Sequence, residues 1–141
     1  MQPRKLILDC DPGHDDAVAI LLALASPAEI ELLGITCVAG NVPLSLTSRN
    51  ALKICELAGH SDVGVYAGAD RPMVRSPVTA EAVHGASGLD LPDGRRLPEP
   101  VMRLRDQHAV DFIIDMVSAH PAGAVTVCPI GPLTNIALAM R

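Results

Sequence analysis

Short apolar runs alternate along the chain with amphipathic segments, and turn-forming residues separate them. An apolar run of four to eight residues between turns is typical of a buried parallel strand, whereas apolar positions three or four residues apart indicate a helix. On these criteria the sequence predicts strands at residues 5–10, 30–38, 63–66 and 125–128. It predicts helices at residues 15–25, 46–58 and 108–120, and a last helix that follows the turn at 131–135 and is still continuing at Arg141.

The alternation of strands and helices predicts an α/β fold with a mainly parallel sheet. Because crossovers between parallel strands are right-handed, we expect a Rossmann-like arrangement with helices on both faces of the sheet. The 141 residues fit a single domain, residues 1–141. No Gly, Asn or Pro ends the last predicted helix before Arg141, so we expect the fold to be incomplete at its C-terminus.

Polar and turn-forming residues follow several of the predicted strands. In a parallel sheet, ligands bind beyond the carboxyl ends of the strands. Asp9 and Asp11, the pair 40–41, the segment 129–131 and the long connection 67–107 all lie at such ends. That connection is rich in Gly, Pro and charge, and so long a connection in a compact domain is usually functional. The sequence therefore predicts one ligand site at this edge of the sheet.

Composition excludes several classes of partner. Apolar residues make up 49% of the chain, the net charge is −5, and the aromatic residues are one Tyr and one Phe. A nucleic-acid polymer is an unfavourable partner, because the chain lacks both a basic surface and the aromatic residues on which bases stack. The longest apolar run, residues 17–25, is too short to cross a bilayer, so we expect no membrane partner. Four scattered cysteines without a Cys-x-x-Cys pair indicate free thiols in a reducing compartment, and we expect a cytoplasmic protein.

Four carboxylates fall within the eight residues from Asp9 to Asp16. Carboxylates this close repel one another, so a compensating positive charge is expected. Capping of the next helix by Asp15 or Asp16 would use one or two of them and leave the others uncompensated. A hard cation bound through oxygen, either Ca²⁺ or Mg²⁺, accounts for the whole cluster.

Two familiar acidic motifs do not fit this cluster. An EF-hand loop that starts at Asp9 would have Gly13 at its fifth position and Ile20 at its twelfth, where acidic ligands are needed. The aspartyl-phosphate phosphatases share the Asp-x-Asp start after a first strand, but they continue with Gly-Thr or a close variant. Here Pro12 and Gly13 follow instead.

The segment Asp9-x-Asp11-Pro12-Gly13-x-Asp15-Asp16-Ala17 closely resembles the signature of the inosine–uridine nucleoside hydrolases. Three further segments resemble motifs of that family in the same order: Val38-Ala39-Gly40-Asn41, His84-Gly85-x-x-Gly88 in the flap within 67–107, and Pro129-x-Gly131-Pro132-Leu133-Thr134-Asn135. The resemblance covers essentially the whole chain. It departs at Ala86, where many members have Glu, so substrate preference is not carried over.

The resemblance implies a calcium-dependent N-glycosidase that releases ribose and a free base from purine or pyrimidine ribonucleosides, in nucleoside catabolism or salvage. It also implies a role for each matching residue. Asp11 would be the general base and also a Ca²⁺ ligand, and Asp16 and the main-chain carbonyl of Ile130 would be further ligands. Asp15 and Asn41 would bond the ribose hydroxyls, and His84 would contact the substrate from the flap. Asp9 would orient its neighbours.

Three other polar residues have structural interpretations. His14 is expected to be a loop residue at a helix start, whereas Thr134 and Asn135 are expected to cap the last helix. Members of the family are considerably longer than this chain, and the absent part would supply another aspartate ligand and a leaving-group histidine. The competing hypothesis is therefore a catalytically impaired fragment or assembly module that retains the half-site. An uncovered sheet edge also favours self-association, so we expect a homo-oligomer.

Overall fold

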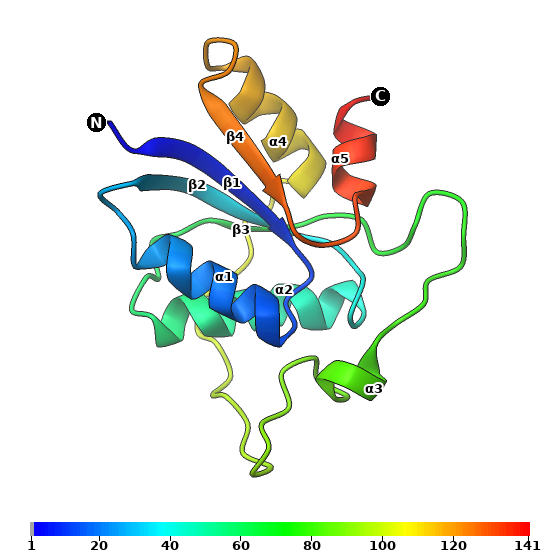
Figure 1. Ribbon diagram of the computed structural model, residues 1–141. Helices are drawn as coiled ribbons and strands as arrows, with labels where there is room; N and C mark the ends of the chain where they lie inside the picture. The colour runs from blue at the N-terminus through cyan, green and yellow to red at the C-terminus, as the bar shows by residue number, and fades with distance from the viewer. Residues whose placement is uncertain (1) are drawn as a thin grey trace.

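The computed structural model describes residues 2–141, and its centre is one parallel sheet. The four strands are β1 (Arg4–Cys10), β2 (Ile30–Cys37), β3 (Val65–Ala67) and β4 (Val125–Pro129). They lie in the order β3-β2-β1-β4 (Figure 1). Every neighbouring pair is parallel, so the carboxyl ends of all four strands meet at one edge.

Helices cover both faces of this sheet, which confirms the predicted fold class (Figure 1). One face carries α1 (His14–Leu24) and α2 (Leu44–Leu57), and the other carries α4 (Ala109–Ser118) and α5 (Thr134–Ala139). A short helix, α3 (Glu81–His84), lies in the long connection between β3 and α4. No helix within residues 2–141 is long and apolar enough to cross a membrane.

The central strand β1 is buried between two apolar clusters. Ile7 packs on one face with Phe112 and Ile113 of α4, whereas Leu8 and Cys10 pack on the other face with residues of α1 and α2. Each fully buried side chain of this size stabilises the fold by about 1.5–3 kcal/mol. The strand is therefore held from both sides, and its carboxyl end is a rigid support for the acidic residues that follow.

Several element boundaries differ from those predicted. Helix α2 begins at Leu44, ahead of the predicted position 46, because Pro43 has an extended backbone that leads directly into the first turn. Helix α3 was not predicted, since two hydrogen bonds to the carbonyl of Ala80 form a turn too short to show periodicity. Helix α5 ends at Ala139, before the predicted Arg141, with Met140 as its C-cap.

Candidate functional site

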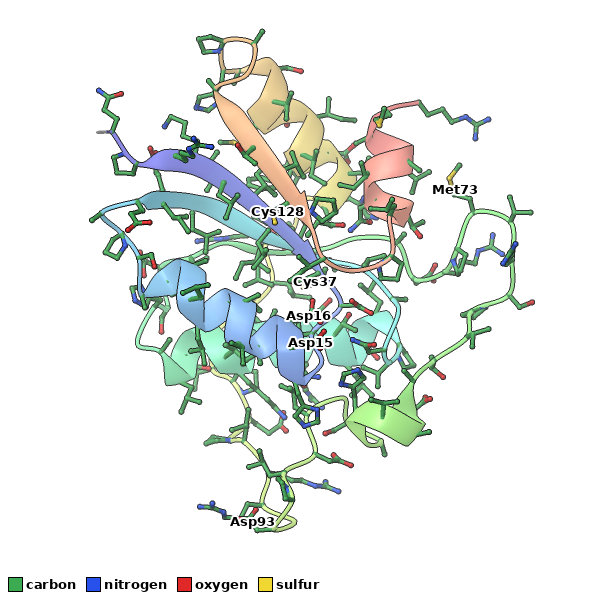
Figure 2. All side chains as sticks on the ribbon, viewed as in Figure 1. Asp15, Asp16, Cys37, Met73, Asp93 and Cys128 are labelled. Carbon is green, nitrogen blue, oxygen red and sulfur yellow. The ribbon has the colours of Figure 1, made fainter. Side chains whose placement is uncertain are left out.

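The acidic residues after β1 gather where the sheet edge meets the start of α1. Figure 2 shows Asp15 and Asp16 at the first turn of this helix, beside the ends of the strands. Asp9, Asp11 and Asp16 are buried, with exposed fractions of 0%, 5% and 2%, whereas Asp15 is exposed. Three carboxylates that water reaches poorly are thus brought together at the predicted edge.

Asp9 is held by two donors from other elements. Its Oδ1 accepts a hydrogen bond from Thr36 Oγ1 at 2.6 Å and one from Asn135 Nδ2 at 2.8 Å. The first follows from sheet register, because Asp9 and Thr36 are paired residues of β1 and β2. Burial raises the pKa of Asp9 although both hydrogen bonds favour its charged form.

Asn135 was expected to cap α5 together with Thr134, and that prediction is wrong. The helix has no side-chain cap bond, and Asn135 is fully buried beneath the strand ends. Besides Asp9, its amide donates to the carbonyl of Cys37 at 3.1 Å and accepts from the Ala69 amide at 2.8 Å. One side chain therefore joins the ends of β1 and β2 to the loop that follows β3.

Asp11 lies between two glycines that leave space for it. Its Oδ2 accepts from the backbone amide of Asn41 at 2.7 Å, and the Asn41 side chain donates back to the Asp11 carbonyl at 2.9 Å. A Cβ atom on Gly131 would lie 2.7 Å from Asp11 Oδ1, and one on Gly40 would overlap the same carboxylate. Burial raises the pKa of Asp11 above its ordinary value.

Asp16 carries the most perturbed carboxylate of this cluster. Its Oδ2 accepts from the Gly13 amide at 3.4 Å, while the buried Oδ1 has no hydrogen-bond partner among the described residues. Burial, followed by the negative charge of Asp11, raises the pKa of Asp16 from 3.8 to about 6. The N-cap of α1 is Gly13, and it is Asp16, not Asp15, that bonds its amide.

Ile130 lies at the same edge, directly after β4. Its amide donates to the Asp9 carbonyl at 2.8 Å, which ties the end of β4 to the end of β1. Within residues 2–141, no group of three or more His, Cys, Asp or Glu side chains is arranged to hold a metal ion.

The flap reaches back over this edge from the connection 67–107. Its entry is tied by the Ala80 amide, which donates to the Asn41 carbonyl at 2.8 Å. His84, at the end of α3, contacts His14 at the start of α1. His14 was expected to be a loop residue, and that prediction is wrong. It is the first residue of α1, and its side chain contacts His84.

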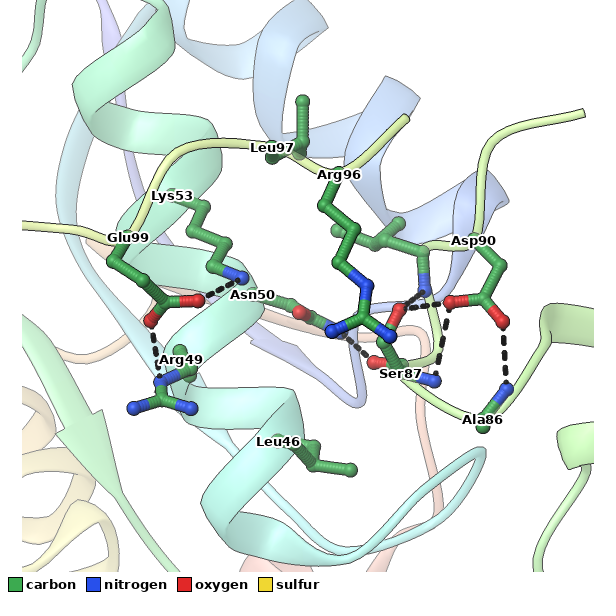
Figure 3. Close-up of a pocket in the computed structure, with 11 residues that line it drawn as sticks. Leu46, Arg49, Asn50, Lys53, Ala86, Ser87, Asp90, Arg96, Leu97 and Glu99 are labelled. Carbon is green, nitrogen blue, oxygen red and sulfur yellow. Dashed lines mark hydrogen bonds and ion pairs between the residues drawn. The ribbon is translucent and has the colours of Figure 1, made fainter. Parts of the chain in front are cut away.

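Asn50 of α2 provides a second tie to the flap and was missed by the sequence analysis. This buried amide donates to the Pro12 carbonyl at 3.1 Å and to the Ser87 carbonyl at 2.9 Å, the latter drawn in Figure 3. The pocket in that view, about 250 Å³, lies between α2 and the flap. Glu99 pairs there with Arg49 and Lys53, and none of the acidic cluster lines the pocket, so it is separate from the candidate site.

Comparison with known proteins gives a matching family model and several similar chains. The family model for the inosine-uridine preferring nucleoside hydrolase matches residues 6–141. An uncharacterized protein of Schizosaccharomyces pombe is 57% identical over 137 residues, which are 97% of this chain and 43% of that protein. The pyrimidine-specific ribonucleoside hydrolase RihB of Escherichia coli is 49% identical over 142 residues, covering 100% of this chain and 43% of that protein.

Solved structures give the same result. A purine-preferring ribonucleoside hydrolase from Gardnerella vaginalis superposes with a TM-score of 0.87 at 40% identity, over 97% of this chain and 43% of that one. A plant nucleoside hydrolase superposes with a TM-score of 0.82 at 37% identity, over 98% of this chain and 42% of that one. The chain thus spans less than half the length of the relatives that it matches.

Proposed function

The chain belongs to the inosine-uridine preferring nucleoside hydrolase family, and from this premise we propose that the protein hydrolyses the N-glycosidic bond of ribonucleosides. One observation carries the proposal: Asp11 and Asp16 are buried together at the carboxyl edge of a parallel sheet. One oxygen of this pair, Asp16 Oδ1, has no hydrogen-bond partner among the described residues. Since named relatives include a pyrimidine-specific and a purine-preferring hydrolase, we propose both base classes as substrates.

Asp11 is the proposed general base. Its carboxylate takes a proton from a water molecule, whose oxygen forms a bond to C1′ of the ribose while the bond from C1′ to the base nitrogen breaks. The electron pair of that bond stays on the base nitrogen, which takes a proton from solvent, and Asp11 then returns its own proton to solvent. One water molecule is consumed, and the products are ribose and free base. General-base assistance of this kind contributes roughly 10²–10⁴-fold to a rate. The buried carboxylates also stabilise the positive charge that develops on the sugar.

The proposed cofactor is Ca²⁺, held by the carboxylates of Asp11 and Asp16 and the main-chain carbonyl of Ile130. The residues present fit such an ion: the donors are hard oxygens, and Asp16 Oδ1 is buried with no hydrogen-bond partner in the described chain. When bound, the ion supplies positive charge that orients neighbouring hydroxyls and makes water more acidic. Its charge would also oppose the two effects that raise the pKa of Asp16, which are burial and, after it, repulsion by Asp11.

The remaining residues are proposed to hold the substrate. Asp15 is exposed at the start of α1 and accepts from a ribose hydroxyl, and the half-buried amide of Asn41 bonds another. His84 contacts the nucleoside from the flap. Asp9 contacts no substrate and instead, through Thr36 and Asn135, fixes the strand end on which Asp11 stands.

The alternative is an assembly module that keeps this site without catalysis. It is less favoured, because each function named among the relatives described above is that of a hydrolase. We retain homo-oligomerisation as part of the proposal, since β4 is an edge strand of the described sheet and unpaired edges favour association. The proposed location is the cytoplasm, supported by four free cysteines, of which three are buried.

A product assay tests the proposed reaction. The full-length protein is incubated with inosine, uridine and cytidine, with and without inorganic phosphate, and the free base and sugar are separated chromatographically. The proposal predicts equal amounts of base and unphosphorylated ribose in both buffers, and loss of both products in a chelator. Formation of ribose 1-phosphate, or intact nucleosides throughout, would contradict it.

A further inference from the structure

His14 holds the side chain of His84 in two ways. The two rings stack with their centroids 5.5 Å apart and their planes 24° from parallel, and the two Nδ1 atoms are 3.3 Å apart. The backbone amide of His14 also donates to His84 Nδ1 at 3.4 Å. The position of the His84 ring is therefore set by one residue at the start of α1.

The same side chain also reaches the far end of the flap turn. Nε2 of His14 lies 3.0 Å from the carbonyl oxygen of Asp90, and because a carbonyl only accepts, this nitrogen carries a proton. Asp90 in turn closes the segment 84–90, since its amide donates to the His84 carbonyl and its carboxylate accepts from the Ala86 amide. His14 thus contacts both ends of the turn 84–90, the His84 ring at one end and the Asp90 carbonyl at the other.

The other ties of the flap do not reach His84. Asn41 bonds the amide of Ala80, and Asn50 bonds the carbonyl of Ser87, so both hold main chain only. Gly13 is needed for the close approach, because a Cβ atom there would lie 2.6 Å from His84 Nδ1. The orientation of the His84 ring depends on the contact with His14.

We propose that His14 is a positioning residue, which fixes His84 and the flap turn 84–90 over the nucleoside site. It acts through His84 and does not touch the reacting atoms. The part of this inference that concerns turnover rests on the proposed function, but the position of the flap is measurable without any substrate. The two ideas can therefore fail independently.

Hydrogen exchange followed by mass spectrometry measures the flap directly. His14→Ala removes both side-chain contacts, the stacking on His84 and the bond to the Asp90 carbonyl, and keeps only the backbone amide. His14→Phe keeps a ring that can stack, and His14→Gln keeps a donor that can reach the Asp90 carbonyl. We expect exchange in residues 84–90 to accelerate about tenfold in His14→Ala, which loses two weak contacts. Each partial variant loses one such contact, and we expect an acceleration of about threefold there. Exchange in β1 stays unchanged in all three, which shows that the fold is intact.

His60→Phe is the matched control, since His60 follows α2 and its side chain has no hydrogen bond within the described residues. It should leave exchange in the flap unaltered. If His14→Ala also leaves exchange in residues 84–90 unaltered, the inference is overturned whatever the activity of the protein.

A double-mutant cycle in the full-length protein separates positioning from general support. His14→Ala should lower kcat/KM for inosine about tenfold, yet cause no further loss when added to His84→Ala. If the loss of kcat/KM in the double variant equals the product of the two single losses, His14 has a merely structural role and the inference is overturned. If the flap loosens as expected but the parent protein cleaves no nucleoside, the proposed function fails and the assigned flap contact stands.

Discussion

Replacing Asp16 by Asn should make the protein more stable at neutral pH in the absence of a divalent cation. Asp16 is 2% exposed, its Oδ1 has no hydrogen-bond partner in the described chain, and its pKa is raised from 3.8 to about 6. Each pKa unit is worth about 1.36 kcal/mol, so ionised Asp16 costs roughly 3 kcal/mol of folding free energy. Asparagine has nearly the same shape, keeps an acceptor for the Gly13 amide, and carries no charge.

The pH dependence follows from the direction of this shift. Below about pH 4 the carboxyl is protonated in both the folded and the unfolded chain, so it adds no penalty. Between about pH 4 and pH 6 only the unfolded chain ionises, and stability falls as the pH rises. Above pH 6 the full penalty is present. The gain from Asp16→Asn should therefore be small at pH 4 and reach its maximum of roughly 3 kcal/mol near pH 7.

Urea unfolding at pH 4 and pH 7, in chelator and in calcium, measures this difference. Calcium at about 100 times its dissociation constant should stabilise the parent by about 2.7 kcal/mol and the variant far less. Asp15→Asn is the matched control, because Asp15 is exposed and its replacement should change stability by less than about 0.5 kcal/mol. A variant less stable than its parent at pH 7 in chelator, or an equal gain from Asp15→Asn, would refute the reasoning.

Three further substitutions test other parts of the site. Asn41→Ala removes the side-chain amide that is proposed to bond the ribose, but keeps the backbone amide that donates to the Asp11 carboxylate. Steady-state kinetics should therefore show KM raised about tenfold with a smaller change in kcat. Asn135→Ala removes a donor to Asp9, a donor to the Cys37 carbonyl and the acceptor of the Ala69 amide, all at a fully buried position, and should cost about 2–4 kcal/mol in urea unfolding; a loss under 1 kcal/mol would contradict the bridging role. Gly131→Ala places a Cβ atom against Asp11 Oδ1, so calorimetry should show calcium binding at least tenfold weaker with circular dichroism unchanged, and undiminished binding would count against the proposed ligand.

The acidic cluster was predictable because its members are neighbours in the chain. Asp9 lies near the end of a buried strand and Asp11 directly after it, so the turn and helix that follow keep their carboxylates at the same edge of the sheet. Asn41 and Ile130 were also placed at this edge, since each follows a strand of the same parallel sheet.

The bridging amides were not predictable from local pattern. Asn135 reaches Asp9 across 126 positions of sequence, and its place after a turn gave the signal of a helix cap. Asn50 is one of several buried polar residues of an amphipathic helix, and its partners, the carbonyls of Pro12 and Ser87, lie in loops far away in sequence. Thr36 gave a signal of a polar contact with Asp9, because a hydroxyl in a buried strand needs a hydrogen-bond partner.

The contact between His14 and His84 depended in the same way on tertiary structure. These residues are 70 positions apart, and the flap that brings them together has little periodicity of its own. Sequence pattern locates elements and the chemistry of neighbouring residues, whereas contacts made by loops depend on how the whole chain packs.

The central claim is that Asp11 activates water for cleavage of the N-glycosidic bond, and steady-state kinetics on inosine and uridine test it most directly. The comparison uses the full-length protein, Asp11→Asn, and Asp62→Asn as a control at an exposed aspartate outside the site. The account predicts that Asp11→Asn lowers kcat by at least about 10²-fold on both substrates, with Asp62→Asn unchanged. Turnover by Asp11→Asn within a few-fold of the parent would contradict the role assigned to this carboxylate.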